Sequence, residues 1–374
     1  MNSWKSIKLS DVCYFSSDKI EVSNLSLDNY VSTENMLPNK SGICIAANLP
    51  NTPLTVAFNL GDILLSNIRP YFKKIWLANF NGGCSNDVLV LKAKESIDAK
   101  FLYYILSDNK FFDYDTANSK GTKMPRGDKV AIMNYEFSLP PLDIQKKIAG
   151  VLGALDDKIE LNNKINTSLE QQMYTLVEQD ILNIETKISL DEFCNVFTGR
   201  KNANEFEKNG VNKFFTCGPE ALTINSFIYN GPAIIVSGNG AYTGRTRFYN
   251  GKFDLYQRTY ACTIKENIKS DYIYILYPIL KLQLEKKLMG GTHGSAIPYI
   301  VMNDIAKFQV PFNEAVFNKI APMCKAMINK IQANEAENEK LSALRDTLLP
   351  KLMGGEIDVS KVDINELNAA DMLL

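Results

Sequence analysis

The chain has 374 residues, of which 45% are hydrophobic and 22% are charged, a balance typical of globular proteins. Its formal net charge of −1 excludes a uniformly basic nucleic-acid-coating protein, so any surface for nucleic acid has to be local. The absence of an apolar run of about 18 residues excludes a membrane span, and the seven scattered cysteines contain no Cys-x-x-Cys pair that would indicate zinc.

The length suits two or three domains. The N-terminal sequence MNSWKSIKLSDVC has no signal-peptide-like apolar core, so we expect a cytoplasmic protein with reduced cysteines.

Residues 1–142 predict a first globular domain. Short β-branched or alternating segments such as TVAFNL, DILLSNI and DVLVLKA are separated by Gly, Asn and Pro, which is typical of a mixed or antiparallel sheet. The stretch AKFLYYILSDNKFFDYDTAN predicts one helix, and the polar loop SKGTKMPRGDK follows it.

Residues 143–183 predict a long helix that starts after Pro140 and Pro141, because proline disfavours continuation of whatever precedes it. Apolar residues recur at steps of three and four along one narrow seam, the pattern of a helix that pairs with another. The seam consists of Ile148, Leu155, Ile159, Asn162, Leu169 and Leu176.

The chain then repeats itself. Residues 184–312 predict a second globular domain, in which KISLDEFCNVFTGR restates IKLSDVCYF, and residues 313–353 predict a second long helix. One register aligns Ile148 with Ile320, Asn162 with Asn334 and Leu169 with Leu341. The second seam consists of Ile320, Met327, Ile331, Asn334, Leu341 and Leu348, and an acidic tail occupies residues 354–374.

These patterns predict an α+β fold with two globular domains in tandem, each followed by a long helix. A pseudo-twofold axis between the repeats would make the two helices an antiparallel coiled coil. The seam asparagines would favour one register at some cost in stability.

Signals for catalysis are missing. The only histidine, His293, has no second histidine with which to bind a metal, and we interpret it as a polar loop residue. The loop SGNGAYTGR fails both the Walker A and the Gly-x-Gly-x-x-Gly spacings, and either a structural turn or a DNA-facing loop fits it. Adenine methyltransferases carry an Asn-Pro-Pro-aromatic element. In this chain Leu139 and Leu142 stand on either side of the proline pair, in place of the asparagine and the aromatic residue. We therefore expect a chain without catalytic residues and without a metal.

Basic and aromatic loop clusters remain, at equivalent places in the two repeats. Arg and Lys neutralise phosphates, Arg binds guanine in bidentate fashion, and Asn reads adenine. The candidate DNA-binding residues of the first repeat are Asn67, Arg69, Tyr71, Lys73, Lys74, Lys120, Lys123 and Arg126. Those of the second are Asn239, Tyr242, Arg245, Arg247, Arg258, Thr292 and His293.

Three classes of function compete: a non-catalytic DNA-recognition and assembly subunit, an enzyme with its own recognition domain, and a coiled-coil protein–protein adaptor that does not bind DNA. The missing catalytic signals disfavour the enzyme. Strongly salt-dependent binding to duplex DNA separates the recognition subunit from the adaptor.

The runs LPPLDIQKKIAGVL and LRDTLLPKLMGGEI resemble spacer helices in specificity subunits of type I restriction-modification systems. GDILLSNIRPYFKK and GPAIIVSGNGAYTGR resemble segments of that family's target recognition domains. The resemblance implies a bipartite DNA target with a fixed gap, and a role in DNA methylation and phage defence. It also implies partners docked on the helices, namely two methyltransferase (modification) subunits and up to two restriction (translocase and endonuclease) subunits. S-adenosylmethionine, ATP and Mg would belong to those partners.

Overall fold

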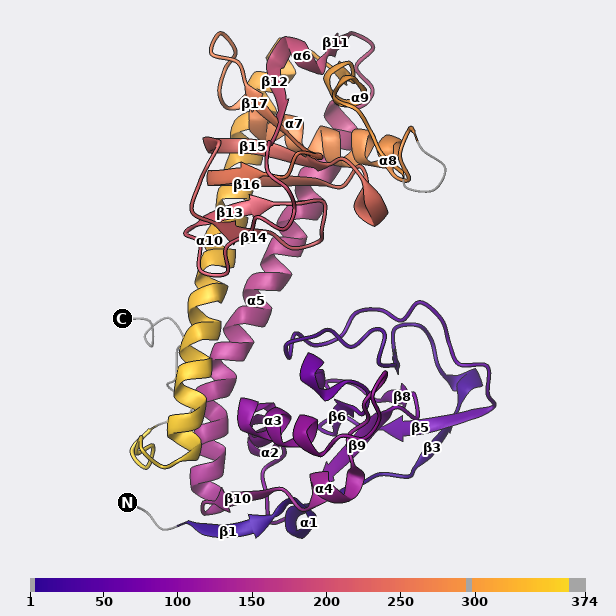
Figure 1. Ribbon diagram of the computed structural model, residues 1–374, viewed down its shortest axis with the longest axis vertical. Helices are drawn as coiled ribbons and strands as arrows, with labels where there is room; N and C mark the ends of the chain where they lie inside the picture. The colour runs from indigo at the N-terminus through magenta and orange to yellow at the C-terminus, as the bar shows by residue number, and fades with distance from the viewer. Residues whose placement is uncertain (1–3, 294–297, 363–374) are drawn as a thin grey trace. The chain divides into compact units, whose positions relative to one another are not determined.

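The computed structural model describes residues 4–293 and 298–362, and the chain divides into two compact units. The first unit comprises residues 1–161 and 337–374, and the second comprises Asn162–Ala336. Two long helices, α5 (Leu142–Asp180) and α10 (Glu314–Met353), each contribute one part to each unit. Each unit is thus a globular α+β piece together with a stretch of paired helix (Figure 1).

The first unit contains ten short strands and four short helices among its described residues. Its strands are β1 (Lys5–Lys8), β2 (Cys13–Phe15), β3 (Lys19–Glu21), β4 (Tyr30–Val31), β5 (Leu54–Phe58), β6 (Ile63–Ser66), β7 (Ile75–Leu77), β8 (Gly82–Cys84), β9 (Val88–Ala93) and β10 (Glu136–Leu139). Its helices besides α5 and α10 are α1 (Leu9–Val12), α2 (Ala99–Ser107), α3 (Asn109–Asn118) and α4 (Lys129–Met133), with the 3-10 turns η1 (Val22–Asn24) and η2 (Pro70–Phe72).

The central sheet of the first unit has the order β2-β9-β6-β7, with every pair antiparallel. A second sheet has the order β3-β5-β8-β4, and β1 pairs with β10. Strand β6 is buried along its whole length, since both of its faces are covered. Ile63 and Leu65 face the cluster formed with α2, whereas Leu64 faces a separate cluster around Phe58 and Trp76.

The second unit repeats this plan. Its strands are β11 (Lys187–Ser189), β12 (Cys194–Thr198), β13 (Asn212–Phe215), β14 (Leu222–Ile224), β15 (Tyr229–Ser237), β16 (Thr246–Leu255), β17 (Thr259–Ile264) and β18 (Gln309–Pro311). Its other elements are α6 (Leu190–Phe193), the 3-10 turn η3 (Gly240–Tyr242), α7 (Tyr272–Ile279), the π-helical segment η4 (Leu280–Leu284), α8 (Glu285–Leu288) and α9 (Met302–Ala306).

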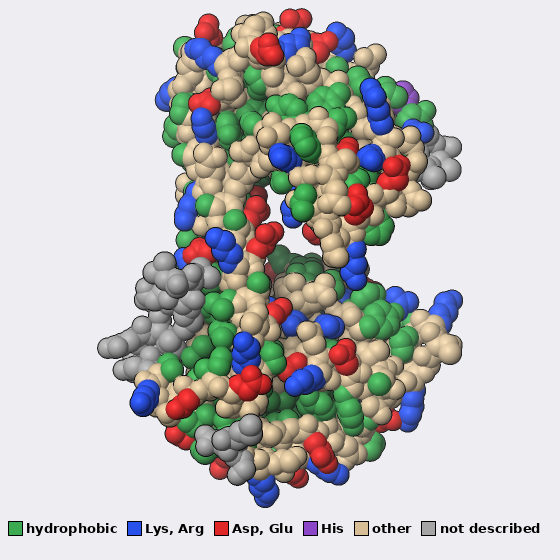
Figure 2. Space-filling model, turned by 60° about the vertical axis from the view of Figure 1, so that its left-hand side comes forward, with side chains coloured by type: hydrophobic (Ala, Val, Ile, Leu, Met, Phe, Trp, Pro, Cys, Tyr) green, Lys and Arg blue, Asp and Glu red, His purple; other side chains and the backbone are tan. Residues whose placement is uncertain are grey.

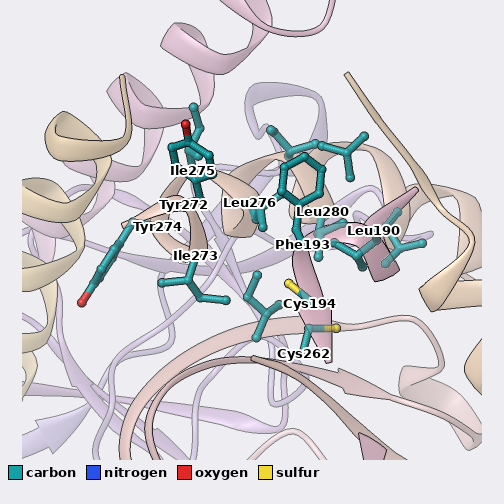
Figure 3. Packing of buried hydrophobic residues seen from close by; sticks show 14 of the residues in the cluster. Leu190, Phe193, Cys194, Cys262, Tyr272, Ile273, Tyr274, Ile275, Leu276 and Leu280 are labelled. Carbon is teal, nitrogen blue, oxygen red and sulfur yellow. The ribbon is translucent and has the colours of Figure 1, made fainter. Parts of the chain in front are cut away.

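Its sheet has the order β12-β17-β15-β16-β13-β14, so the first four strands match β2-β9-β6-β7 of the first unit. The alternation of side chains is repeated as well. Ile234 and Val236 of β15 pack into the large cluster beneath α7, whereas Ala233 and Ile235 pack on the opposite face with Phe215. Figure 3 shows the large cluster, in which α6, α7, β12 and β17 converge.

Helices α5 and α10 pair within each unit. In the first unit Leu155 and Leu341 are both fully buried against each other, and Ile159, Leu344 and Leu348 pack around them. The Arg345 guanidinium donates to the Asp156 carboxylate, and Lys158 Nζ lies 3.5 Å from a carboxylate oxygen of Glu337. Residue numbers therefore rise along α5 in the direction in which they fall along α10. This is the antiparallel pair that the seam predicts.

In the second unit the two helices lie side by side and share the large cluster (Figure 1). Asn334 donates a hydrogen bond from Nδ2 to Oδ1 of Asn166 at 2.7 Å. Asn334 and Asn162 are both buried, as expected of asparagines on the seam.

The helices bury more than the predicted seam. Val177, Cys324 and Ile328 pack with the globular part of the second unit, and Leu152 packs with that of the first. Each helix therefore has two buried stripes, one against its partner helix and one against a globular piece. A seam chosen for pairing alone includes only part of this surface.

One predicted helix is divided, and one helix of the second unit is irregular. The stretch predicted as one helix at 99–118 forms α2 and α3, because Asp108 takes extended backbone angles and its side chain accepts a hydrogen bond from Lys110 N–H. In the second unit Pro278 lies inside α7, and a π-helical segment follows at once. Proline lacks an N–H to donate and crowds the preceding turn, which is a recognised cause of such irregularities.

Candidate nucleic-acid interface

The first predicted cluster begins where strand β6 ends. The chain there forms the 3-10 turn η2, flanked by Arg69 and Lys73, which both have a left-handed φ of 52°. Residues with a Cβ are strained in this region, so the surroundings must hold the turn. Phe72 N–H donates to Arg69 O at 2.9 Å and Lys73 N–H donates to Pro70 O at 2.8 Å.

The second predicted cluster closes as a hairpin beside this turn. Lys120 and Arg126 exchange two backbone hydrogen bonds of 2.8 Å, and Arg126 also pairs with Ile68. Arg69 N–H donates to Pro125 O at 2.8 Å. The fold therefore brings together two basic clusters that are distant in the sequence. We call the turn and the hairpin a turn–hairpin frame, which consists of residues 66–74 and 119–126 in the first unit.

Four of the cations in this frame are held by the protein itself. Their partners are Asn109 for Lys73, the Thr33 carbonyl for Lys74, Asp128 for Lys120 and Asp87 for Arg126. Burial lowers the pKa of Lys74, and the hydrogen bond from Lys120 lowers the pKa of Asp128. These contacts fix the loops and reduce the free positive charge.

Arg69 and Lys123 form no ion pair with any residue that the structure describes. The Arg69 guanidinium lies 5.9 Å from the centre of the Phe72 ring. Arg69, Phe72 and Met124 contribute to the wall of an open cavity of about 320 Å³. Of the predicted cations in the first unit, these two are the best placed to meet a ligand.

Asn67 has a partly buried environment. Its Oδ1 is buried and has no hydrogen-bond partner among the described residues. A Cβ on Gly127 would stand 3.1 Å from that oxygen and 2.6 Å from Oδ1 of the buried Asp115. The Asn67 side chain thus lies behind the frame, and base contact by this residue stays a prediction.

The second unit has a matching frame, formed by residues 237–245 and the described parts of 291–299. Gly240 opens the turn η3 with a φ of +80° and donates from its N–H to Pro298 O at 3.1 Å. Asn239 pairs with Tyr299, which also pairs with His293. These three contacts have the same pattern as those that join η2 to the first hairpin.

The predicted residues of this frame fall into different environments. The Arg245 guanidinium lies 5.5 Å from the Tyr242 ring centre, and Arg258 is exposed. Thr292 donates to Asp304 Oδ2 at 2.7 Å, and His293 Nε2 lies 3.5 Å from the same oxygen.

Arg247 is directed inward. Its guanidinium donates to the carbonyl oxygens of Thr216 and Gly218 at 3.0 and 3.2 Å, and it lies 5.2 Å from the Phe215 ring centre. Burial lowers the pKa of Arg247. These contacts position the 216–218 loop, and a DNA contact by Arg247 stays a prediction.

Sequence reasoning missed the residues that support the frames. Asp87, Asn109 and Asp115 are isolated polar residues in the sequence, and nothing in their spacing links them to the loops. A signal for the hairpins was present: KGTKMPR and HGSAIPY share Gly at the second place and Pro at the sixth.

On the visible face of each unit, acidic and basic side chains are interspersed (Figure 2). Within residues 4–293 and 298–362, no group of three His, Cys, Asp or Glu side chains is placed to hold a metal ion. No helix in the described part of the chain is long and apolar enough to cross a membrane.

The fold and the two frames define a class of proteins that carry two tandem α+β units on a pair of long helices. The chain belongs to the family of the type I restriction modification DNA specificity domain, whose model matches residues 1–171 and 184–343. The α+β tandem fold is that of a solved type I restriction-modification S subunit from M. genitalium. That structure has a TM-score of 0.58 and 17% identity, and the match covers 94% of this chain and 97% of that one.

Two curated relatives have related sequences. The type I restriction enzyme EcoDI specificity subunit of Escherichia coli is 30% identical over 175 residues, which is 46% of this chain and 38% of that protein. The type I restriction enzyme MjaIX specificity subunit of Methanocaldococcus jannaschii is 22% identical over 311 residues, which is 72% of this chain and 71% of that protein.

Proposed function

We propose that this chain is the non-catalytic DNA-recognition and assembly subunit of a type I restriction-modification complex. One observation carries the proposal: the same turn–hairpin frame occurs twice, with different side chains on the two copies. A duplicated frame with different side chains suits a duplex target of two unlike half-sites, one for each unit. Family membership and the names of the curated relatives support the same conclusion.

The paired helices would set the gap between the half-sites and carry the partner subunits. The partners would be two methyltransferase subunits, which bind S-adenosylmethionine, and up to two restriction subunits, which use ATP and Mg. The complex would act in the cytoplasm. The names of the relatives, which refer to restriction enzymes, support this assignment of partners.

The test is a genome-wide map of methylated adenines in cells that express this chain together with its partner methyltransferase subunit. The map is compared with that of cells that express the methyltransferase subunit without this chain. We expect a two-part motif with a constant gap that appears only when the chain is present. A folded, co-purifying complex without chain-dependent methylation would overturn the proposal.

DNA binding by the purified complex gives a second test. A recognition subunit neutralises phosphates, so its affinity for the target duplex must fall steeply with salt. Assembly with the methyltransferase but no salt-dependent binding to DNA would favour the adaptor.

A further inference from the structure

The two frames keep one large exposed side chain in common. The segments SNIRPYFKK and SGNGAYTGR align from Ser66 and Ser237, and Tyr71 then falls on Tyr242. Both tyrosines lie in the 3-10 turns, η2 and η3. Their exposed fractions are nearly equal, at 46% and 43%.

The backbone contacts show that this alignment is structural. Arg69 and Gly240 occupy the same place, and each donates from its N–H to the proline carbonyl of its hairpin, at 2.8 and 3.1 Å. The two tyrosines follow these anchored residues at the same distance along the chain. They are therefore carried at equivalent points of two turns that are anchored in the same way.

Most of the neighbouring positions differ in chemistry, and the exception is the pair of cations Lys74 and Arg245. Along the aligned segments, Ile68 corresponds to Asn239, Arg69 to Gly240, Phe72 to Thr243 and Lys73 to Gly244. Side chains that read two unlike sequences have to differ between the frames. A side chain that is kept suits a contact that both half-sites offer.

The environment of each tyrosine leaves its hydroxyl available. The Tyr71 ring packs at 4.8 Å from Phe72, and the Tyr242 ring lies under the Arg245 guanidinium. Neither hydroxyl makes a hydrogen bond to a described residue. By contrast, the hydroxyls of Tyr104 and Tyr260 donate to protein oxygens at 2.6 and 3.1 Å.

Duplex half-sites of different sequence share their sugar–phosphate backbone, and tyrosine hydroxyls are among the groups that donate to phosphate oxygens. On the basis of the proposed function, we infer that the hydroxyls of Tyr71 and Tyr242 donate to phosphate oxygens at equivalent positions of the two half-sites. The two contacts hold each frame in register on the duplex and carry no base preference. The unlike neighbours then read the sequence.

The test uses the full chain in complex with its methyltransferase partners and the variants Tyr71→Phe, Tyr242→Phe and the double variant. Phenylalanine keeps the ring and removes the hydroxyl. A hydrogen bond to a charged group is lost, so we expect each single variant to bind the target duplex about tenfold more weakly. The double variant should show about the product of both losses, because the effects of changes at sites that share no partner are additive.

Tyr14→Phe is the matched control, because Tyr14 is 50% exposed and lies on β2, outside the frame. Its affinity should equal that of the unchanged complex. Thermal unfolding of every variant verifies that the fold is intact.

Two readouts assign the contact to phosphate. Selection from duplexes with randomised half-sites should return the same motif for the unchanged complex and for both variants. Methylphosphonate substitution removes the charge of one phosphate at a time. In each half-site, one such substitution should lower the affinity of the unchanged complex. The same substitution should cause no additional loss of affinity in the variant that lacks the matching tyrosine hydroxyl.

A changed base preference in either half-site would overturn the inference, because the tyrosine would then read sequence. Unchanged affinity in both single variants would also overturn it. Failure of the unchanged complex to prefer any bipartite duplex would instead overturn the proposed function on which the inference rests.

Discussion

Asp115 is a buried acid directly behind the first frame. It lies on α3 and is 1% exposed, and neither carboxylate oxygen has a hydrogen-bond partner among the described residues. The close passage of Gly127 leaves no room for a side chain beside it. Burial raises the pKa of Asp115 from 3.8 to about 7, because the charged form is poorly solvated there.

This environment predicts a pH-dependent stability. Between the unfolded and folded pKa values the native state keeps a proton that the unfolded state releases, so the free energy of unfolding falls as pH rises from 4 to 7. In the Asp115→Asn variant, the decrease in the free energy of unfolding over this pH range should be smaller by about 2–4 kcal/mol. Urea unfolding at pH 5 and pH 8 measures the difference.

Asp113→Asn, an exposed change on the same helix, is the control and should leave the pH profile as it is. If Asp115→Asn and the unchanged chain lose the same stability between the two pH values, Asp115 does not carry the proton.

Arg69 predicts an effect limited to one half-site. Its guanidinium has no ion pair among the described residues and lies at the cavity beside Met124, in the first unit. We expect Arg69→Met to lower affinity about tenfold or more for the half-site read by that unit, because a bidentate base contact is worth about 1–3 kcal/mol. Binding to duplexes with either half-site scrambled measures this.

Lys123→Met gives the comparison, since Lys123 is an exposed cation without an ion pair in the described structure. It should weaken binding for all sequences and reduce the salt dependence. Equal loss at both half-sites for Arg69→Met would contradict a base-reading role.

At the scale of elements, the long helices could be predicted because their apolar spacing persists over many turns. The break at Asp108 was missed because the apolar residues continue on both sides, and one extended residue with a local cap decides it. The frames could be predicted only as separate clusters. Sequence spacing does not reveal that Arg69 bonds to Pro125, or that Asn67 turns inward to Asp115.

A polar network joins three helices of the first unit. Tyr104 of α2 donates to Asp156 of α5 at 2.6 Å, and Arg345 of α10 donates to the other oxygen of Asp156, also at 2.6 Å. Asp346 beside it lies 3.7 Å from Lys40, whose N–H bonds to Lys73 O in the frame. The helix pair and the frame are thus connected through named contacts.

Breaking this network should destabilise the first unit. Arg345→Met leaves Asp156 partly buried without its cation, so we expect a loss of about 2–3 kcal/mol in the free energy of unfolding. A double-mutant cycle with Asp156→Asn should give a coupling above about 1 kcal/mol. Lys351→Met, an exposed change on the same helix, should have little effect, and a coupling near zero would show that the pair is not stabilising.

At the scale of the whole molecule, the repeat links the sequence to the proposed function. The same strand order and the same frame contacts recur in the two units. The first part of α5 packs on the globular piece of the first unit, and the first part of α10 packs on that of the second. The repeat was visible in the sequence because the two helix seams align in one register. The bases that each frame reads depend on loop side chains that differ between the copies, so no repeat pattern predicts them.

One contact within the helix pair offers a test of the proposed gap-setting role. Leu155 and Leu341 form a small cluster of their own, apart from the clusters that anchor the helices to the globular pieces. Truncating both to Ala should cost about 2–5 kcal/mol for each residue, because buried contacts are lost and cavities remain. The frames are not touched by these changes.

We therefore expect the double variant to keep its half-site sequences and to lose its strict gap. Affinity for duplexes whose gap is lengthened or shortened by one base pair should approach that for the native target. Leu161→Ala, an exposed change on α5, should leave gap discrimination intact. If the double variant is measurably destabilised and still discriminates gaps as sharply as the unchanged complex, the helix pair does not set the gap, and the partner subunits must do so.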